Sequence, residues 1–227
     1  MAVTIQIKLN EKLYLRDPQD TELGRRIIRD SILLIDEIGF EQFTFKKLAE
    51  RIHSTEASVY RYFENKHLLL VYLLCWYWEW VKYQIDFATN GISDTRERLR
   101  AAMHIIVNIN KRDTLVDFVD EDILHRIVVA EGSKTYLTKS VDMENQNGFF
   151  ITYKALAKSI AKMITDINPR FQYPHALAST LLEMANRHIY FAEHLPSLTD
   201  VRIVNGDLTP VEQLLEDFAF GLINNHT

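Results

Sequence analysis

The chain has 227 residues, of which 47% are apolar and 25% are charged, and its formal net charge is −5. Its 7 glycines and 5 prolines are roughly half of the number that average usage predicts, which disfavours a β-sandwich or barrel because sheets need many turns. The ordinary apolar content excludes a disordered chain. The single Cys75 and the lack of a signal-peptide core or of an apolar run of about 18 residues predict a cytoplasmic protein without a membrane span.

Apolar residues recur at helical spacing along most of the chain. In the first part this periodicity predicts helices over residues 21–39, 44–52, 55–63 and 65–87. Thr44, Thr55 and Asn65 precede the last three, and their side-chain oxygens can accept a backbone N–H at a helix start. Gly39 is expected to end the first helix, since glycine is the usual residue after a helix C-terminus.

The second part of the chain continues the pattern. Helices are predicted over residues 94–110, 120–131, 149–167, 174–195 and 210–222. Residues 134–148 are the least periodic stretch and the best candidate for a flexible connection. The predicted fold class is therefore all-α with about nine helices. Its predicted parts are an N-terminal arm (1–20), a helix-turn-helix domain (21–66) and a larger helical domain (67–227).

The segment richest in functional signals is residues 44–66, TFKKLAERIHSTEASVYRYFENK. Two short helices joined by a tight turn, with apolar residues inside and hydroxyls outside, favour a helix-turn-helix. Serine and tyrosine hydroxyls, together with the free N–H groups at a helix start, can bind phosphate without a net positive charge. The equal numbers of basic and acidic residues in 21–70, eight of each, therefore do not exclude DNA binding.

This segment resembles the DNA-binding motif of the TetR family of transcriptional regulators. The family pattern is approximately T-x-x-x-[IL]-A-x-x-[AL]-G-[VI]-[ST]-x-[GAP]-[ST]-[LV]-Y-x-[HY]-F-x-[SN]-K-x-x-L. The chain matches it in register at Thr44, Leu48, Ala49, Thr55, Ala57, Ser58, Val59, Tyr60, Tyr62, Phe63, Asn65, Lys66 and Leu69. With the preceding helix the resemblance covers residues 21–70, whereas the remainder resembles the family only in layout.

The resemblance implies a ligand-responsive repressor that binds a palindromic double-stranded DNA operator as a homodimer. It implies phosphate contacts from the starts of two helices, major-groove contacts from the start of the recognition helix, and backbone contacts from two tyrosines. The residues so implied are Thr44, Lys46, Thr55, Glu56, Ala57, Ser58, Tyr60, Tyr62 and Lys66.

Three residues depart from the family pattern. His53 replaces the turn glycine, at a position that often needs a positive φ. Ser54 replaces a small aliphatic residue. Glu56 suits the helix dipole but repels phosphate, unless it accepts a hydrogen bond from a cytosine amino group. These departures bear on the operator sequence more than on the fold. Glu56 and the zero formal charge of the module support an alternative: a helical small-molecule-binding protein that has lost specific DNA reading.

Aromatic residues cluster in the helix predicted over 65–87, where seven lie between Tyr72 and Phe87. By resemblance, the larger domain holds a pocket for an apolar or aromatic molecule. The candidate lining residues are Trp76, Trp80, Met103, His104 and Tyr153. For each of them, ordinary core packing is the alternative.

The last two long helices, 174–195 and 210–222, are the candidate dimer surface. By resemblance, such pairs from two subunits form a four-helix bundle. The residues at helical spacing are Leu177, Leu181, Met184, His188, Phe191, Leu214, Leu215, Phe218 and Leu222, for which intramolecular core is the alternative. Glu183 and His188 lack the i, i+4 spacing of zinc ligands. No metal or cofactor is expected, and no nucleophile motif points to an enzyme.

Overall fold

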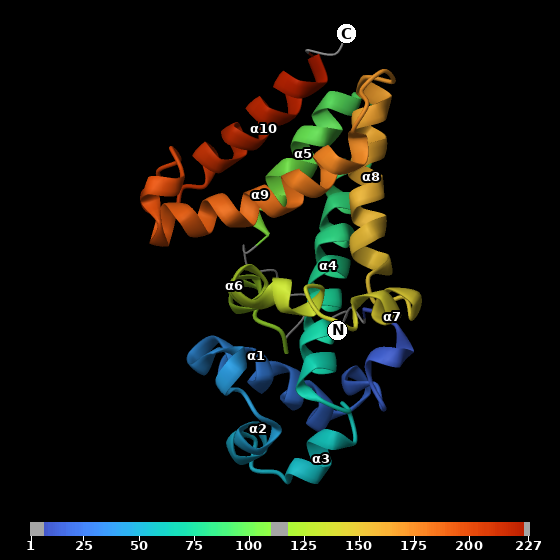
Figure 1. The fold of residues 1–227 in the computed structure, drawn as a ribbon, viewed down its shortest axis with the longest axis vertical. Helices are drawn as coiled ribbons and strands as arrows, with labels where there is room; N and C mark the ends of the chain where they lie inside the picture. Colours follow the sequence, from blue (N-terminus) through green and yellow to red (C-terminus); the bar gives the residue numbers. More distant parts are fainter. Residues whose placement is uncertain (1–6, 110–117, 225–227) are drawn as a thin grey trace. The chain divides into compact units, whose positions relative to one another are not determined.

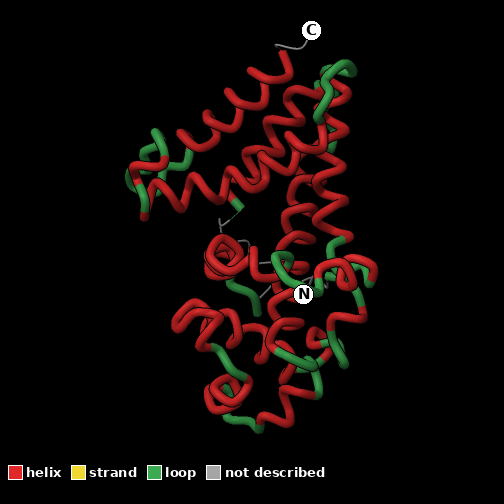
Figure 2. Tube along the Cα trace, in the orientation of Figure 1, coloured by secondary structure: helices red, strands yellow, loops and turns green. Residues whose placement is uncertain are grey.

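The computed structural model describes residues 7–109 and 118–224, and within these residues the protein is helical and contains no strand (Figures 1 and 2). The α-helices are α1 (Glu22–Gln42), α2 (Phe45–Arg51), α3 (Glu56–Tyr60), α4 (Lys66–Thr89), α5 (Thr95–Asn108), α6 (Glu121–Glu131), α7 (Val141–Gln146), α8 (Ile151–Ile167), α9 (Pro174–His194) and α10 (Thr209–Asn224). Four short 3₁₀ segments accompany them: Glu11–Leu13, Pro18–Asp20, Gly132–Thr135 and Pro196–Leu198. The prediction of an all-α fold is confirmed.

The helices belong to two compact units, each made of two stretches of sequence. The first unit comprises Met1–Trp80 and Asn110–Thr152, and the second comprises Val81–Ile109 and Tyr153–Thr227. Helix α4 therefore contributes residues to both. None of the described helices combines the length and the apolar character needed to cross a membrane.

The predicted helix caps are confirmed at all three positions named from the sequence. Thr44 Oγ1 accepts the N–H of Lys47 at 3.2 Å, and Thr55 Oγ1 accepts that of Ser58 at 3.2 Å. Asn65 Oδ1 accepts the N–H of Leu68 at 2.9 Å. Because each cap satisfies a donor that the helix itself leaves unbonded, these local signals fix where α2, α3 and α4 begin.

The regular part of α1 ends at Gly39, as expected from the sequence, and a short helical stretch to Gln42 follows a kink there. Gly39 has a φ of +75°, which interrupts the helix before three further residues complete it at Gln42. The Phe40 N–H, released from the helical pattern, donates to Glu131 Oε1 at 3.1 Å. The interruption thus ties the end of α1 to the end of α6 within the first unit.

The stretch predicted as a flexible connection, residues 134–148, is ordered into secondary structure. It contains the end of the Gly132–Thr135 turn and the whole of α7. The sequence of α7, VDMENQ, has little helical periodicity, and no side chain caps its start. Its Glu144 is bonded to His67 of α4, a contact 77 residues away in sequence, so tertiary contact outweighs weak local propensity here.

Residues 7–20 pack within the first unit and do not project as an arm. Leu13 is fully buried, and the Gln19 amide accepts the Ile7 N–H at 3.1 Å and donates to the Ile7 carbonyl at 2.7 Å. Gly24 allows this close approach, since a Cβ there would lie 2.2 Å from the Pro18 carbonyl oxygen. Residues 1–6 of the predicted arm lie outside the described residues.

The core of the first unit includes a buried polar pair. The Tyr77 hydroxyl lies 2.9 Å from His125 Nδ1, and both side chains are buried. Burial lowers the pKa of His125 to about 4, because a charged imidazole would lose its hydration there. His125 is therefore neutral at neutral pH and can share one hydrogen bond with the tyrosine.

Candidate nucleic-acid interface

Helices α2 and α3 form a helix-turn-helix whose inner side is apolar. Leu48, Val59 and Phe63 are fully buried. The turn between the helices is closed by main-chain hydrogen bonds from Ser54 N–H to the Ala49 carbonyl at 2.9 Å and from His53 N–H to the Glu50 carbonyl at 3.2 Å. These bonds and the buried side chains fix α3 against α2, as a helix that enters a DNA groove requires.

The outer side carries most of the residues expected at DNA. Thr44, Lys46, Thr55, Glu56 and Ala57 are exposed, and Ser58 is half-buried with its Oγ 2.8 Å from Thr55 Oγ1. All of them belong to the first turns of α2 and α3 or to their caps. These two helix starts place N–H groups and hydroxyls at the surface, where they can bind phosphate oxygens.

Tyr60 connects the surfaces of α2 and α3 through a contact between aromatic rings. Its side chain is 46% exposed, and its ring packs edge-to-face on Phe45 with the centroids 5.0 Å apart. Phe45 is the first residue of α2 and Tyr60 is the last of α3. The contact therefore holds the tyrosine ring in place on the surface formed by both helices.

Two exposed cations complete this surface, and only one was identified from the sequence. Among the described residues, neither Lys46 nor Arg61 has a side-chain hydrogen bond or ion pair. Lys47, in contrast, donates to the Gln42 carbonyl at 2.9 Å. Arg61 directly follows α3, and its position beside the matched Tyr60 was the signal that could have indicated it.

Tyr62 is buried, whereas Lys66 is half-buried with its ammonium group bonded to the main chain. Tyr62 is 2% exposed, and its hydroxyl lies 2.7 Å from Thr21 Oγ1. Lys66 Nζ donates to the carbonyls of Phe40, Glu41 and Phe43 at 3.0, 3.1 and 3.1 Å. An ammonium group has three donors, so all those of Lys66 are used within the protein.

Comparison with known proteins agrees with this geometry. Residues 27–73 match the family described as bacterial regulatory proteins, tetR family. Residues 27–73 are thus a TetR-family DNA-binding domain. The matched region covers most of α1, all of α2 and α3, and the first turns of α4.

Solved structures share the fold of this chain over most of its length. AibR in complex with isovaleryl coenzyme A and operator DNA is 16% identical, with a TM-score of 0.58 over 88% of this chain and 98% of that chain. A tetR-family regulatory protein from Rhodococcus RHA1 is 12% identical, with a TM-score of 0.62 over 91% and 97%. A regulator from Saccharomonospora viridis in complex with choline is 20% identical, with a TM-score of 0.59 over 87% and 96%. No curated protein sequence matches this chain.

The turn of this TetR-family helix-turn-helix has the backbone conformation expected from the sequence. His53 has a φ of 49°, in the left-handed region that glycine adopts at no steric cost. The side chain is exposed. The prediction that His53 takes the place of a turn glycine with positive φ is confirmed.

Replacing His53 by glycine is expected to raise the free energy of unfolding by about 0.5–1 kcal/mol, because the strain at positive φ is relieved. Urea denaturation of the purified protein measures this change. The control is His53→Ala, which keeps the strain and should leave stability within about 0.5 kcal/mol of the wild type. An alanine variant as stable as the glycine variant would contradict this account of the turn.

The residues proposed for a ligand pocket are divided between the two units. In the first unit, Trp76 and Trp80 are each 1% exposed, and their rings stack with centroids 6.0 Å apart. In the second unit Met103 is buried, His104 is exposed with Nδ1 3.0 Å from Glu212 Oε2, and the Tyr153 hydroxyl donates to Glu183 Oε1 at 3.0 Å. Their role in ligand binding stays a prediction.

The residues proposed for the dimer surface differ in exposure. Leu177, Leu181, Met184 and Leu215 are buried within the second unit, whereas His188, Phe191 and Leu214 are half-buried. Phe218 and Leu222, four residues apart on α10, are 49% and 46% exposed. His188 Nδ1 lies 2.8 Å from Thr199 Oγ1. No group of three or more potential metal ligands gathers within residues 7–109 and 118–224.

Proposed function

We propose that the protein is a cytoplasmic, homodimeric repressor that binds a palindromic operator and leaves it when a small molecule binds. In this proposal residues 21–66 bind DNA, residues 67–227 provide dimerisation and ligand binding, and residues 1–20 precede both. This proposal rests on the exposed surface formed by the starts of α2 and α3. That surface also carries Tyr60 and the unpaired cations Lys46 and Arg61.

The chemistry of this surface suits a DNA major groove. The groove admits an α-helix, and the exposed residues at the start of α3 can reach base edges. Ala57 can contact a thymine methyl group, and Glu56 can accept a hydrogen bond from a cytosine amino group. The surrounding threonines, Tyr60 and Lys46 would bind phosphates, which fixes the register of α3 on the duplex.

A second copy of the chain is the partner proposed for α10. Phe218 and Leu222 present an apolar stripe that the second unit leaves exposed. Two-fold pairing of such stripes would place two recognition helices on one face of the DNA. Their half-sites would then be one helical turn apart, about 34 Å, and related as a palindrome.

A small apolar or aromatic molecule is the proposed inducer. AibR binds isovaleryl coenzyme A and operator DNA, and the S. viridis regulator binds choline. Proteins of this fold thus combine DNA and small-molecule binding. The inducer must bind the DNA-incompetent state more tightly than the DNA-bound state, since otherwise it would shift no equilibrium.

The test is DNA footprinting on the sequence that flanks the protein's own gene. The wild type should protect a palindromic site, and Tyr60→Phe should bind it roughly tenfold more weakly, because one phosphate hydrogen bond is lost while the packing on Phe45 is kept. The matched control is Tyr83→Phe, which changes an exposed tyrosine outside the helix-turn-helix, on α4. This variant should bind the operator as the wild type does. A folded dimer that protects no site at low salt would instead support the alternative of a small-molecule-binding protein that no longer reads DNA.

A further inference from the structure

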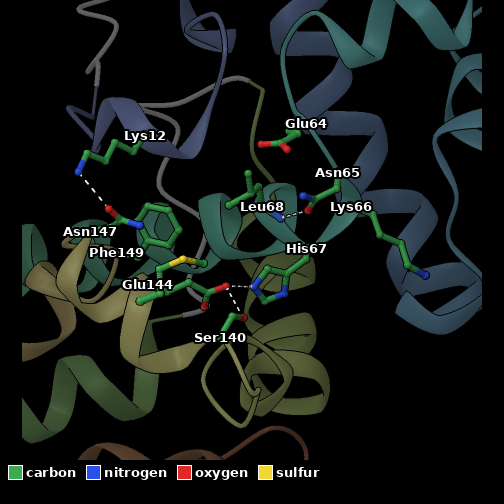
Figure 3. A pocket seen from close by; sticks show the side chains of 11 residues that line it. Lys12, Glu64, Asn65, Lys66, His67, Leu68, Ser140, Glu144, Asn147 and Phe149 are labelled. Atoms are coloured by element: carbon green, nitrogen blue, oxygen red, sulfur yellow. Dashed lines mark hydrogen bonds and ion pairs between the residues drawn. The ribbon is translucent and has the colours of Figure 1, made fainter.

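A pocket of about 560 Å³ lies within the first unit, at the start of α4 (Figure 3). Residues 64–68 form one side of it, and Met143 and Glu144 of α7 form the other with the flanking residues 140, 147 and 149. Lys12 closes a third side. None of the residues proposed above for the inducer lines this pocket, so it is a separate candidate site.

The pocket contains a buried carboxylate that the protein bonds only in part. Glu144 is 5% exposed, and its Oε1 accepts the His67 Nε2–H at 2.7 Å and the Ser140 hydroxyl at 2.9 Å. Its Oε2 is buried and has no hydrogen-bond partner in the described structure. A buried carboxylate oxygen without a donor is costly, and a donor brought by a ligand would recover that cost.

The cations that line the pocket are already engaged. Lys12 Nζ donates to Asn147 Oδ1 at 3.1 Å, and Lys66 Nζ donates to three main-chain carbonyls. Glu64 adds a second carboxylate, an exposed one, to the lining. The pocket therefore has an unmatched acceptor in Glu144 Oε2, which neither lysine contacts.

Part of the remaining lining is apolar. Leu68, Met143 and Phe149 line the pocket beside the carboxylate. A site with one unbonded carboxylate oxygen offers too few oxygen ligands for Ca²⁺ or Mg²⁺, which take six or more. It suits a cation that brings N–H donors and a short hydrocarbon chain.

We propose that this pocket binds a small organic ammonium ion, such as a protonated primary amine with a short alkyl chain. The ammonium donates to Glu144 Oε2, and the chain packs on Leu68 and Phe149. Because Oε2 is buried in the structure, the Glu144 side chain must shift slightly to bring this oxygen to the ligand. The bound ion connects the first turn of α4 with α7, and its binding requires no DNA.

Isothermal titration calorimetry with n-butylammonium chloride tests the proposal. The wild type should bind n-butylammonium but neither n-butanol, which lacks the charge, nor n-butyrate, which reverses it. Glu144→Gln should weaken binding roughly tenfold or more, because the charge-assisted hydrogen bond is lost. Asp142→Asn removes an exposed carboxylate of the same helix that does not line the pocket, and it should bind as the wild type does.

Hydrogen exchange of the wild type decides the location independently of any variant. n-Butylammonium should slow exchange in residues 64–68 and 140–149. The proposal is overturned if n-butanol binds equally well, if folded Glu144→Gln binds normally, or if n-butylammonium gives no heat or protects other segments. If Glu144→Gln does not fold, the wild-type exchange pattern and the comparison with n-butanol and n-butyrate still test the proposal.

Discussion

Replacing Lys66 by methionine is expected to lower the free energy of unfolding by about 2–3 kcal/mol, since hydrogen bonds to a charged donor are among the strongest in proteins. The ammonium joins the start of α4 to the main chain at the end of α1 through three carbonyls, and it lies 4.8 Å from the centroid of the Phe40 ring. Methionine keeps the packing of the stem but donates nothing. Urea denaturation measures the loss.

The same variant should bind operator DNA more than tenfold more weakly, because α2 starts directly beyond the carbonyls that Lys66 holds. The matched control is Lys46→Met. Lys46 is exposed and unpaired among the described residues, so its loss should leave stability within about 0.5 kcal/mol. It should instead reduce the slope of log affinity against log salt by about 1, as the loss of a phosphate contact does.

The pair of variants separates two roles for Lys66. A positioning role predicts lower stability and an unchanged salt slope. The opposite result, unchanged stability with a slope reduced by about 1, would establish the phosphate contact that the family resemblance implies.

Truncation of Trp80 to alanine is expected to destabilise the protein by about 3–5 kcal/mol, the usual cost of removing a large buried aromatic side chain. Trp80 is 1% exposed and stacks on Trp76, so the deletion leaves a cavity lined by side chains that are themselves buried. Phe87→Ala on the same helix is the control. Because Phe87 is 73% exposed, its truncation should cost little. Thermal and urea unfolding compare the two.

A small effect of Trp80→Ala would change the assignment of this residue. If the variant lost less than about 1 kcal/mol, the ring would contribute little packing, well below the range for core aromatics. Trp80 would then be better explained as the wall of a ligand cavity than as core.

The sequence allowed the helix-turn-helix to be predicted in detail because its signals are local. The side chains of the caps Thr44, Thr55 and Asn65 each accept the N–H of a residue three positions later. The positive φ of His53 follows from its position in the turn, where the family pattern has glycine. Such features depend on a few neighbouring residues, which periodicity and residue type describe well.

Contacts between distant residues could not be predicted in this way. Lys66 and Tyr62 lie in the matched motif, yet their bonds reach 26 and 41 residues back along the chain and draw them away from the surface. Helix α7 has weak local signals and packs through a partner 77 residues earlier. Helical periodicity records which face of a helix is apolar, but it does not record which distant polar group a side chain meets.

The division into units has a consequence for how the chain folds as it is synthesised. The first unit needs both Met1–Trp80 and Asn110–Thr152, with part of the second unit encoded between them. When Trp80 leaves the ribosome, Phe40 still lacks Glu131 and His67 still lacks Glu144. The DNA-reading helices therefore emerge early, but both supports are present only once Glu144 has been added, at a rate of about 5–20 residues per second. During those seconds the nascent regulator presents its helix-turn-helix without the contacts that later hold α1 and α4, and its first unit is complete only after Thr152 has been added.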